Sequence, residues 1–197
     1  MNVKQQWSRY RGSIDRMKPT FVTRTGEKLR VRLLQPVDAP KLLDLFHQLS
    51  PETRRRRFHG NVDHLSTDVL TAASVELSDV DNRTTQGAVV MTKRGSNGDE
   101  EFVGVVRLAR PLNDAASSIA EAAIVVRDDF QGQGVGTELL RRMVLLAQRM
   151  QVRTIRAVFA AYNEGAINLF RNLGLPYTID IDHGETEMRI AVPSQGA

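Results

Sequence analysis

A buried strand, a glycine turn and a long helix follow one another between Ala120 and Met150, and this stretch most constrains how the chain can fold. The apolar run at 122–126 is typical of a strand that is covered on both faces. From Thr137 onward, leucine and methionine recur at three- and four-residue steps, which predicts an amphipathic helix. The sequence therefore predicts a helix that begins directly after three glycines.

The turn contains Gly132, Gly134 and Gly136. Glycines let a ligand approach the backbone and permit dihedral angles that other residues avoid. We therefore expect the amides from Gly132 to Thr137 to converge at the positive end of the helix, where a phosphate or diphosphate is stabilised. A Walker loop is excluded because Gly136 is not followed by lysine, and a dinucleotide fingerprint is excluded because Thr137 stands where its third glycine would be.

The remaining pattern, Gln131-x-x-Gly134-x-Gly136 after an apolar strand, resembles the coenzyme A loop of the GNAT superfamily of N-acetyltransferases. A second block, from Asn163 to Leu175, resembles the next helix of that family. The resemblance implies an α/β (α+β) fold, with a mixed, mostly antiparallel sheet splayed at its central strand and helices on both faces. It also implies acetyl-CoA as co-substrate. The residues expected to bind it lie in the strand, the turn and the two helices: Ile124, Val125, Val126, Gln131, Gly132, Gln133, Gly134, Val135, Gly136, Thr137, Asn163 and Phe170.

Glu121 is an acid in an otherwise apolar strand. Alternation along the strand places it on the same face as Ala123 and Val125. A buried, unpaired carboxylate is costly, so we expect Glu121 at a wet cleft or in an ion pair. At the cleft it is predicted to act as the general base that deprotonates the acceptor amine. The alternative is a cross-strand ion pair, for example with Arg107.

The Ala120-Glu121 pair, the run 128–132 and the segment 49–53 followed by arginines are similar to the acetyltransferase domain of bacterial Pat-type protein lysine acetyltransferases. This resemblance implies a lysine acceptor, such as one on an acyl-CoA synthetase, and a glutamate base at the position of Glu121. No regulatory domain of the kinds found in those proteins is expected here. Two alternatives stay open: an acetyltransferase for small amines and a non-catalytic acyl-CoA sensor.

Two residues of the second block have more than one interpretation. Asn163 is expected to cap a helix, to hydrogen-bond the cofactor, or both. Phe170 stands where many superfamily members have a tyrosine that reprotonates the coenzyme A thiolate, and Tyr162 is the nearby substitute. A thiol has a pKa of about 8.5, so departure as thiolate without this acid is not a severe obstacle.

With 197 residues, 41% of them hydrophobic and 25% charged, the composition is typical of one soluble globular domain. We expect an irregular arm over residues 1–25, held by Trp7, Tyr10 and Phe21, and a single acetyltransferase domain over 26–197. The lack of cysteine excludes disulfides and a cysteine acyl-enzyme, and the four histidines lack metal-ligand spacing, so no metal is expected. No signal peptide or bilayer-spanning run occurs, which predicts a cytoplasmic protein, acting as a monomer or dimer.

Positive charge is concentrated near the start of the chain. Residues 1–60 contain 14 Lys and Arg against 5 Asp and Glu, and the peak is the run at 54–57. This run is expected to be a solvated helix face, or to bind the 3′-phosphate of coenzyme A, an acidic partner protein or nucleic acid. Nucleic acid is the least favoured partner because no aromatic residues are interleaved.

Periodicity and turn residues predict the remaining elements. Asp38 is expected to cap the first helix, and Pro51 to begin a second. The pair Asn97-Gly98 predicts a hairpin. Strands are expected over 29–34, 87–93, 101–109, 152–161, 177–181 and 185–192, and helices over 42–49, from 50, over 66–77 and from 163.

Overall fold

The computed structural model describes residues 13–14, 18–58 and 60–194. Its strands are β1 (Thr20–Val22), β2 (Lys28–Leu33), β3 (Gln86–Arg94), β4 (Glu100–Ala109), β5 (Ile119–Val126), β6 (Thr154–Ala160), β7 (Tyr177–Asp182) and β8 (Glu185–Ala191). Its α-helices are α2 (Ala39–His47), α3 (Pro51–Phe58), α4 (Thr67–Ser78), α5 (Val135–Arg149) and α6 (Glu164–Arg171). Two short 3₁₀ helices, η3 (Pro36–Asp38) and η4 (Asp128–Phe130), complete the list. None of the helices in these described ranges is long and apolar enough to cross a bilayer.

All eight strands join one sheet in the order β1-β2-β3-β4-β5-β6-β8-β7. Only the central pair, β5 and β6, is parallel, and this pairing covers just Ile119–Ala122 of β5. Beyond Ala122, β5 stays paired with β4 while β6 continues beside β8, so the two central strands diverge. The predicted mixed sheet, splayed at its central strand, is confirmed.

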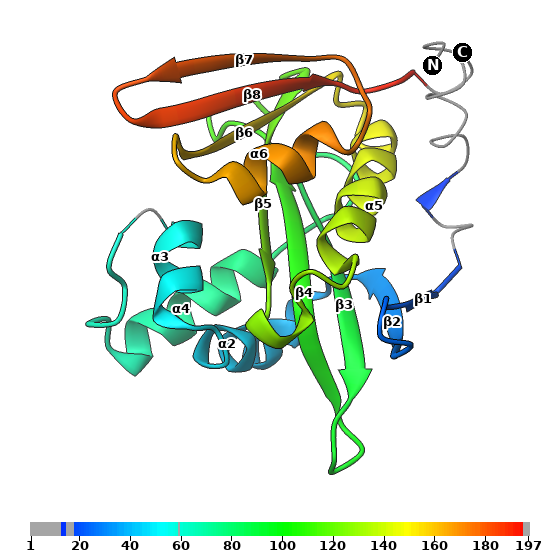
Figure 1. Cartoon of the computed structure of the whole chain (residues 1–197), viewed down its shortest axis with the longest axis vertical. Helices are drawn as coiled ribbons and strands as arrows, with labels where there is room; N and C mark the ends of the chain where they lie inside the picture. The colour runs from blue at the N-terminus through cyan, green and yellow to red at the C-terminus, as the bar shows by residue number, and fades with distance from the viewer. Residues whose placement is uncertain (1–12, 15–17, 59, 195–197) are drawn as a thin grey trace.

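Helices cover both faces of the sheet, as predicted (Figure 1). The helix α5 packs against β3, β4 and β5 on one face, and α2 packs against β4 on the other, with α4 against α2. Each face has its own hydrophobic cluster: Leu139, Met143 and Leu146 of α5 belong to the first, and Leu45, Phe102 and Val125 to the second. The strand β5 therefore lies between two apolar layers, and its alternate side chains enter different clusters.

Three local predictions differ from the structure. Residues 20–22, predicted as part of an irregular arm, form β1, because Phe21 pairs with Leu29 of β2 and packs on the core. The helix predicted from Thr137 begins at Val135, since Gly134 already serves as its N-cap. Asp38 does not cap α2 with its side chain, which instead accepts hydrogen bonds from Arg32 and from the Gln35 amide. Trp7 and Tyr10 lie outside the described residues.

A charged cluster joins β2, η3, α2 and β4, and its Arg32 lies over the ring of Phe102 from the second hydrophobic cluster. The Arg32 guanidinium donates to Asp38 at 2.6 Å and to Glu100 at 2.5 Å, and Lys41 donates to Glu100 at 3.1 Å. The hydrogen bond from Arg32 is the largest influence on the Glu100 carboxyl and lowers its pKa to about 2 against the opposing effect of burial.

This cluster makes stability depend on acidity. Because the folded-state pKa of Glu100 is depressed, its contribution is complete above the unfolded pKa near 4.5 and is lost as the pH falls toward 2. We expect the free energy of unfolding to drop by about 2 kcal/mol over that interval on account of Glu100. In urea titrations at several pH values, Glu100→Gln should reduce the loss of unfolding free energy as the pH falls. The control Glu101→Gln should leave that loss unchanged, because Glu101 has longer ion pairs, at 3.4 and 3.5 Å. If the unfolding free energy depended on pH equally in wild type and Glu100→Gln, the contribution assigned to Glu100 would be contradicted.

Candidate functional site

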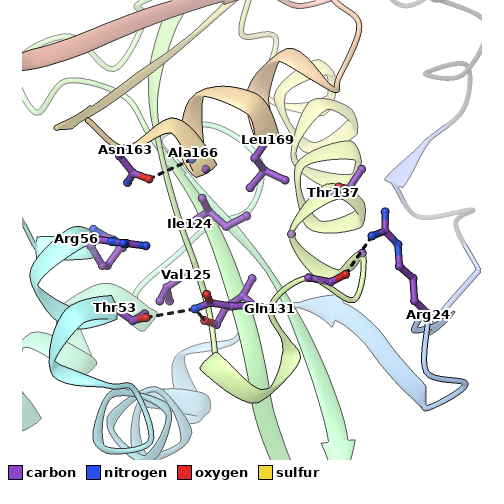
Figure 2. A pocket seen from close by; sticks show the side chains of 16 residues that line it. Arg24, Thr53, Arg56, Ile124, Val125, Gln131, Thr137, Asn163, Ala166 and Leu169 are labelled. Carbon is purple, nitrogen blue, oxygen red and sulfur yellow. Dashed lines mark hydrogen bonds between the residues drawn. The ribbon is translucent and has the colours of Figure 1, made fainter. Parts of the chain in front are cut away.

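A cavity of about 370 Å³ opens where β5 and β6 diverge (Figure 2). The glycine turn closes one end, α3 lies on one side and α6 on the other. The cavity therefore lies at the junction that the sequence singled out, between a strand, a glycine turn and a helix start. Residues from five separate parts of the chain line it: Arg24, Thr53, Arg56, Arg57, Ile124, Val125, Val126, Gln131, Gly132, Gly134, Gly136, Thr137, Asn163, Gly165, Ala166 and Leu169.

The glycine turn has the backbone geometry that its residues allow. Gly132 and Gly134 have φ angles of +72° and +91°, in the left-handed region that favours glycine. The first backbone bond of α5 runs from the Glu138 amide to the Gly134 carbonyl at 3.1 Å. The amides that precede it, up to Thr137, have no partner within the helix and stand at its positive end. This is a suitable cradle for the phosphates of a nucleotide cofactor.

The segment after β1 clamps this turn from outside. The Arg24 amide donates to the Gln133 carbonyl at 3.1 Å, and the Arg24 guanidinium donates to the Gly132 carbonyl at 3.1 Å. Thr25 adds a hydrogen bond to the Gln133 side chain at 2.6 Å. Figure 2 shows the Arg24 side chain extending beside the turn at the cavity's edge. A second source of positive charge thus lies next to the converging amides, which the sequence did not indicate.

A carboxylate ties α3 to the loop that follows β5. Asp128 accepts hydrogen bonds from the Ser50 amide at 2.8 Å and from the Thr53 hydroxyl at 2.7 Å. Burial raises the pKa of Asp128, but these hydrogen bonds outweigh it and the net pKa is lowered. Gln131 completes the connection by donating to Thr53 at 3.2 Å and to the Val126 carbonyl at 3.0 Å. The start of α3 is therefore fixed at the mouth of the cavity.

The edge of β5 and the start of α6 form the remaining walls. Ile124, Val125 and Val126 line the cavity at the point where β6 no longer pairs with β5, so a ligand can lie along this edge as an added strand does. The Asn163 side chain accepts a hydrogen bond from the Ala166 amide at 3.1 Å, which confirms its predicted role as helix cap. Asn163 also lines the cavity, so the cap leaves it next to any bound ligand.

Four residues predicted for the site do not line this cavity. Val135 is fully buried in the first cluster, and Phe170 is 3% exposed and stacked on Phe159. Gln133 turns its side chain to the Asp129 carbonyl at 2.6 Å, although its backbone belongs to the turn. Glu121, the fourth, lies beyond the cavity wall. Tyr162, the substitute for a tyrosine at position 170, is 78% exposed and is not part of the wall.

Glu121 takes part in an ion pair, but not with the partner named from sequence. Its Oε2 accepts a hydrogen bond from Arg156 at 2.7 Å, and Arg156 also donates to Glu187 at 2.6 Å. Glu121 is opposite Arg156 in the parallel pairing of β5 with β6. Arg107 is opposite Ala123 and donates to Gln86 instead. The side chain of Glu121 remains 57% exposed, and its Oε1 makes no hydrogen bond within the described part of the chain.

The arginine run on α3 divides between surface and cavity. Arg54 pairs with Asp63 at 3.0 Å and lies over the Phe46 ring, and Arg56 pairs with Glu52. Arg56 and Arg57 line the cavity, so half of the run is not simply a solvated face. Burial lowers the pKa of Arg57 to about 10, with the charge of Arg107 acting in the same direction and that of Glu121 opposing it. Arg57 therefore remains a cation at neutral pH.

The residues that the sequence did not assign to the cavity fall into two groups. Gly165, Ala166 and Leu169 are on α6 just after Asn163, and the helical period from that cap would have indicated them. Arg24 is distant in sequence and carried no local signal, whereas Thr53 belongs to the segment 49–53, which was noted only for its family resemblance. No group of three His, Asp or Glu side chains capable of holding a metal ion occurs among residues 13–14, 18–58 and 60–194.

Comparison with known proteins points in the same direction as this geometry. The family model described as an acetyltransferase (GNAT) domain matches residues 28–176. A curated protein described as an acetyltransferase, from Pseudomonas aeruginosa, is 28% identical over 149 residues, which are 76% of this chain and 75% of the relative.

Two solved structures have a similar fold. The GNAT domain of PAT from S. lividans has a TM-score of 0.73 and 25% identity, covering 87% of this chain and 95% of that one. A putative acetyltransferase from Salmonella typhimurium, solved with its cofactor acetyl-CoA, has a TM-score of 0.58 and 19% identity, covering 86% and 96%. The second likeness concerns the fold alone.

Proposed function

Because the chain belongs to the family of GNAT acetyltransferase domains, we propose that it transfers the acetyl group of acetyl-CoA to a protein lysine side chain, with Glu121 as general base. The observation that carries the proposal is the cavity itself, which joins a helix start with unpaired amides to the open edge of β5. The similarity of 25% to the PAT domain, and the motifs shared with Pat-type enzymes, support a protein acceptor. A cytoplasmic location remains a prediction.

The residues present fit acetyl-CoA. Its diphosphate would accept hydrogen bonds from the amides between Gly132 and Thr137, next to the Arg24 guanidinium. Its pantetheine arm would lie along β5 from Val126 to Ile124, an edge that β6 leaves unpaired. The thioester would then reach the point where β5 and β6 diverge.

Glu121 lies on the same strand, beyond this edge. A lysine amine is mostly protonated at neutral pH, with a reference pKa of about 10.4, and must lose a proton before it attacks a thioester. The Oε1 of Glu121, on a side chain that is 57% exposed, would accept that proton directly or through a water. The amine nitrogen then forms the new bond to the acetyl carbon, and the bond to sulfur breaks with departure of the thiolate. Phe170 and Tyr162 supply no acid at the cavity, and a thiolate needs none.

The proposal is tested by incubating the protein with labelled acetyl-CoA and a cell lysate, followed by mass spectrometry of lysine residues. We expect label on protein lysines, and little label when Glu121→Gln replaces the wild type. Label confined to small molecules would contradict a protein acceptor. Binding of acetyl-CoA without any labelled product would contradict an enzymatic role and favour a sensor.

A further inference from the structure

A second cavity, of about 160 Å³, lies under α2, α3 and α4, against the face of β5 that carries Val125. Apolar side chains such as Phe46, Leu70, Leu77 and Val105 form most of its wall. Among the described residues that line it, only Ser74 and Arg57 are polar, and the Ser74 hydroxyl donates to the Thr71 carbonyl at 2.8 Å. The size and the mostly apolar lining of this cavity suit a small apolar group.

This apolar cavity adjoins the larger cavity between β5, the glycine turn, α3 and α6, which is called the cofactor cavity from here on. Arg57 and Val125 line both, so these two side chains form the partition between them. Val125 is 9% exposed, and the Arg57 guanidinium lies 5.1 Å from the centre of the Phe58 ring. Within the described part of the chain Arg57 makes no hydrogen bond or ion pair, so its side chain can move aside without breaking a polar contact. A group attached to the thioester can therefore enter the apolar cavity past Arg57.

We propose that the apolar cavity receives the alkyl tail of acyl-CoA substrates longer than acetyl-CoA, so that the protein also transfers short straight-chain acyl groups such as butyryl. The inference rests on the proposed function for the position of the thioester, but not on the identity of the acceptor. The reaction is the same as with acetyl: the amine nitrogen bonds to the acyl carbon, the proton goes to Glu121, and coenzyme A leaves as thiolate.

Charge favours an acyl tail over the acceptor as the occupant. A lysine ammonium that approached through this partition would pass the Arg57 cation and be repelled by it. A neutral alkyl tail is not repelled and packs against the aliphatic stem of the arginine. The apolar cavity is thus suited to the part of the substrate that carries no charge.

Titration calorimetry with acetyl-CoA and butyryl-CoA tests the proposal without any acceptor. Each buried methylene is worth about fourfold in affinity, so two should make butyryl-CoA bind about 15-fold more tightly, with a more negative heat-capacity change. Ala73→Leu, which fills the apolar cavity, should abolish this preference. The matched control Ala72→Leu adds the same side chain at the exposed neighbouring position and should preserve it.

Equal or weaker binding of butyryl-CoA by the wild type would overturn the inference, as would equal losses in both variants. An altered KM for the acceptor in Ala73→Leu, with the acyl preference intact, would assign the cavity to the acceptor and also overturn it. Should Ala73→Leu fail to fold, Leu70→Ala enlarges the cavity and should raise the preference for hexanoyl-CoA over butyryl-CoA; no change would count against the inference. Failure to bind acetyl-CoA at all would instead contradict the proposed function.

Discussion

Glu121→Gln is expected to lower kcat about 100- to 1000-fold with a lysine acceptor, while the Kd for acetyl-CoA stays within about threefold. Glutamine keeps the size of the side chain and one hydrogen bond to Arg156 but cannot accept a proton. Since the side chain lies outside the wall of the cofactor cavity, cofactor binding should be unaffected. Release of the coenzyme A thiol at saturating substrates measures kcat, and titration calorimetry measures the Kd for acetyl-CoA.

The structure offers a matched control for this variant. Glu187 is the other carboxylate bonded to Arg156, so Glu187→Gln disturbs the same ion-pair cluster without removing the proposed base. Its kcat should remain within about threefold of wild type. The turnover of Glu121→Gln should also increase about tenfold for each unit of increasing pH below the lysine pKa. Without a general base, only acceptor that is already neutral in solution can react, and that fraction rises about tenfold per unit. Unchanged turnover in Glu121→Gln, or equal losses in both variants, would remove Glu121 from the mechanism.

Gly134→Val is expected to weaken acetyl-CoA binding by at least about 30-fold. Gly134 has a φ of +91°, and a branched side chain is strained there by about 1–2 kcal/mol. A Cβ at this position would contact the Phe21 ring at 3.4 Å, and the turn would have to change its backbone angles to relieve the strain. The amides that begin α5 would then no longer converge on the diphosphate. Titration calorimetry with acetyl-CoA gives the loss directly.

Gly184→Val is a control that separates loss of the diphosphate site from a general loss of stability. Gly184, in the turn between β7 and β8, has a φ of +83°, and no atom lies within 4 Å of a Cβ added there. Both variants should therefore lose comparable stability in thermal unfolding, but only Gly134→Val should lose affinity for acetyl-CoA. Wild-type affinity in Gly134→Val would contradict the assignment of the glycine turn as the diphosphate site.

Features that depend on neighbouring residues were predictable. The alternation along β5, the period of α5 and the Asn97-Gly98 turn each arise from backbone preferences over a few residues, and the structure has all three. The helix cap at Asn163 was predictable for the same reason. The strand β1 was not, because three residues become a strand only through pairing with β2.

The ion pair of Glu121 shows how far local reasoning extends. The sequence indicated that an acid in an apolar strand needs a partner or water, but the choice of Arg156 depends on the register of β5 against β6. In the neighbouring register against β4, Ala109 rather than Arg107 is opposite Glu121. A shift of two residues in pairing would have reversed the outcome, and no local pattern determines it.

By itself, the sequence determined the strand, glycine turn and helix at the centre of the fold, and with them the proposed place for a diphosphate, since dihedral freedom and helix polarity are local properties. Only the tertiary structure decided which distant side chains complete the site: Arg24 reaches the turn across 108 residues and Thr53 reaches Gln131 across 78. The apolar cavity behind Val125 is likewise a product of how α2 and α4 pack over the sheet. The physical reason is that packing and strand register join residues whose separation along the chain carries no information about their distance in space.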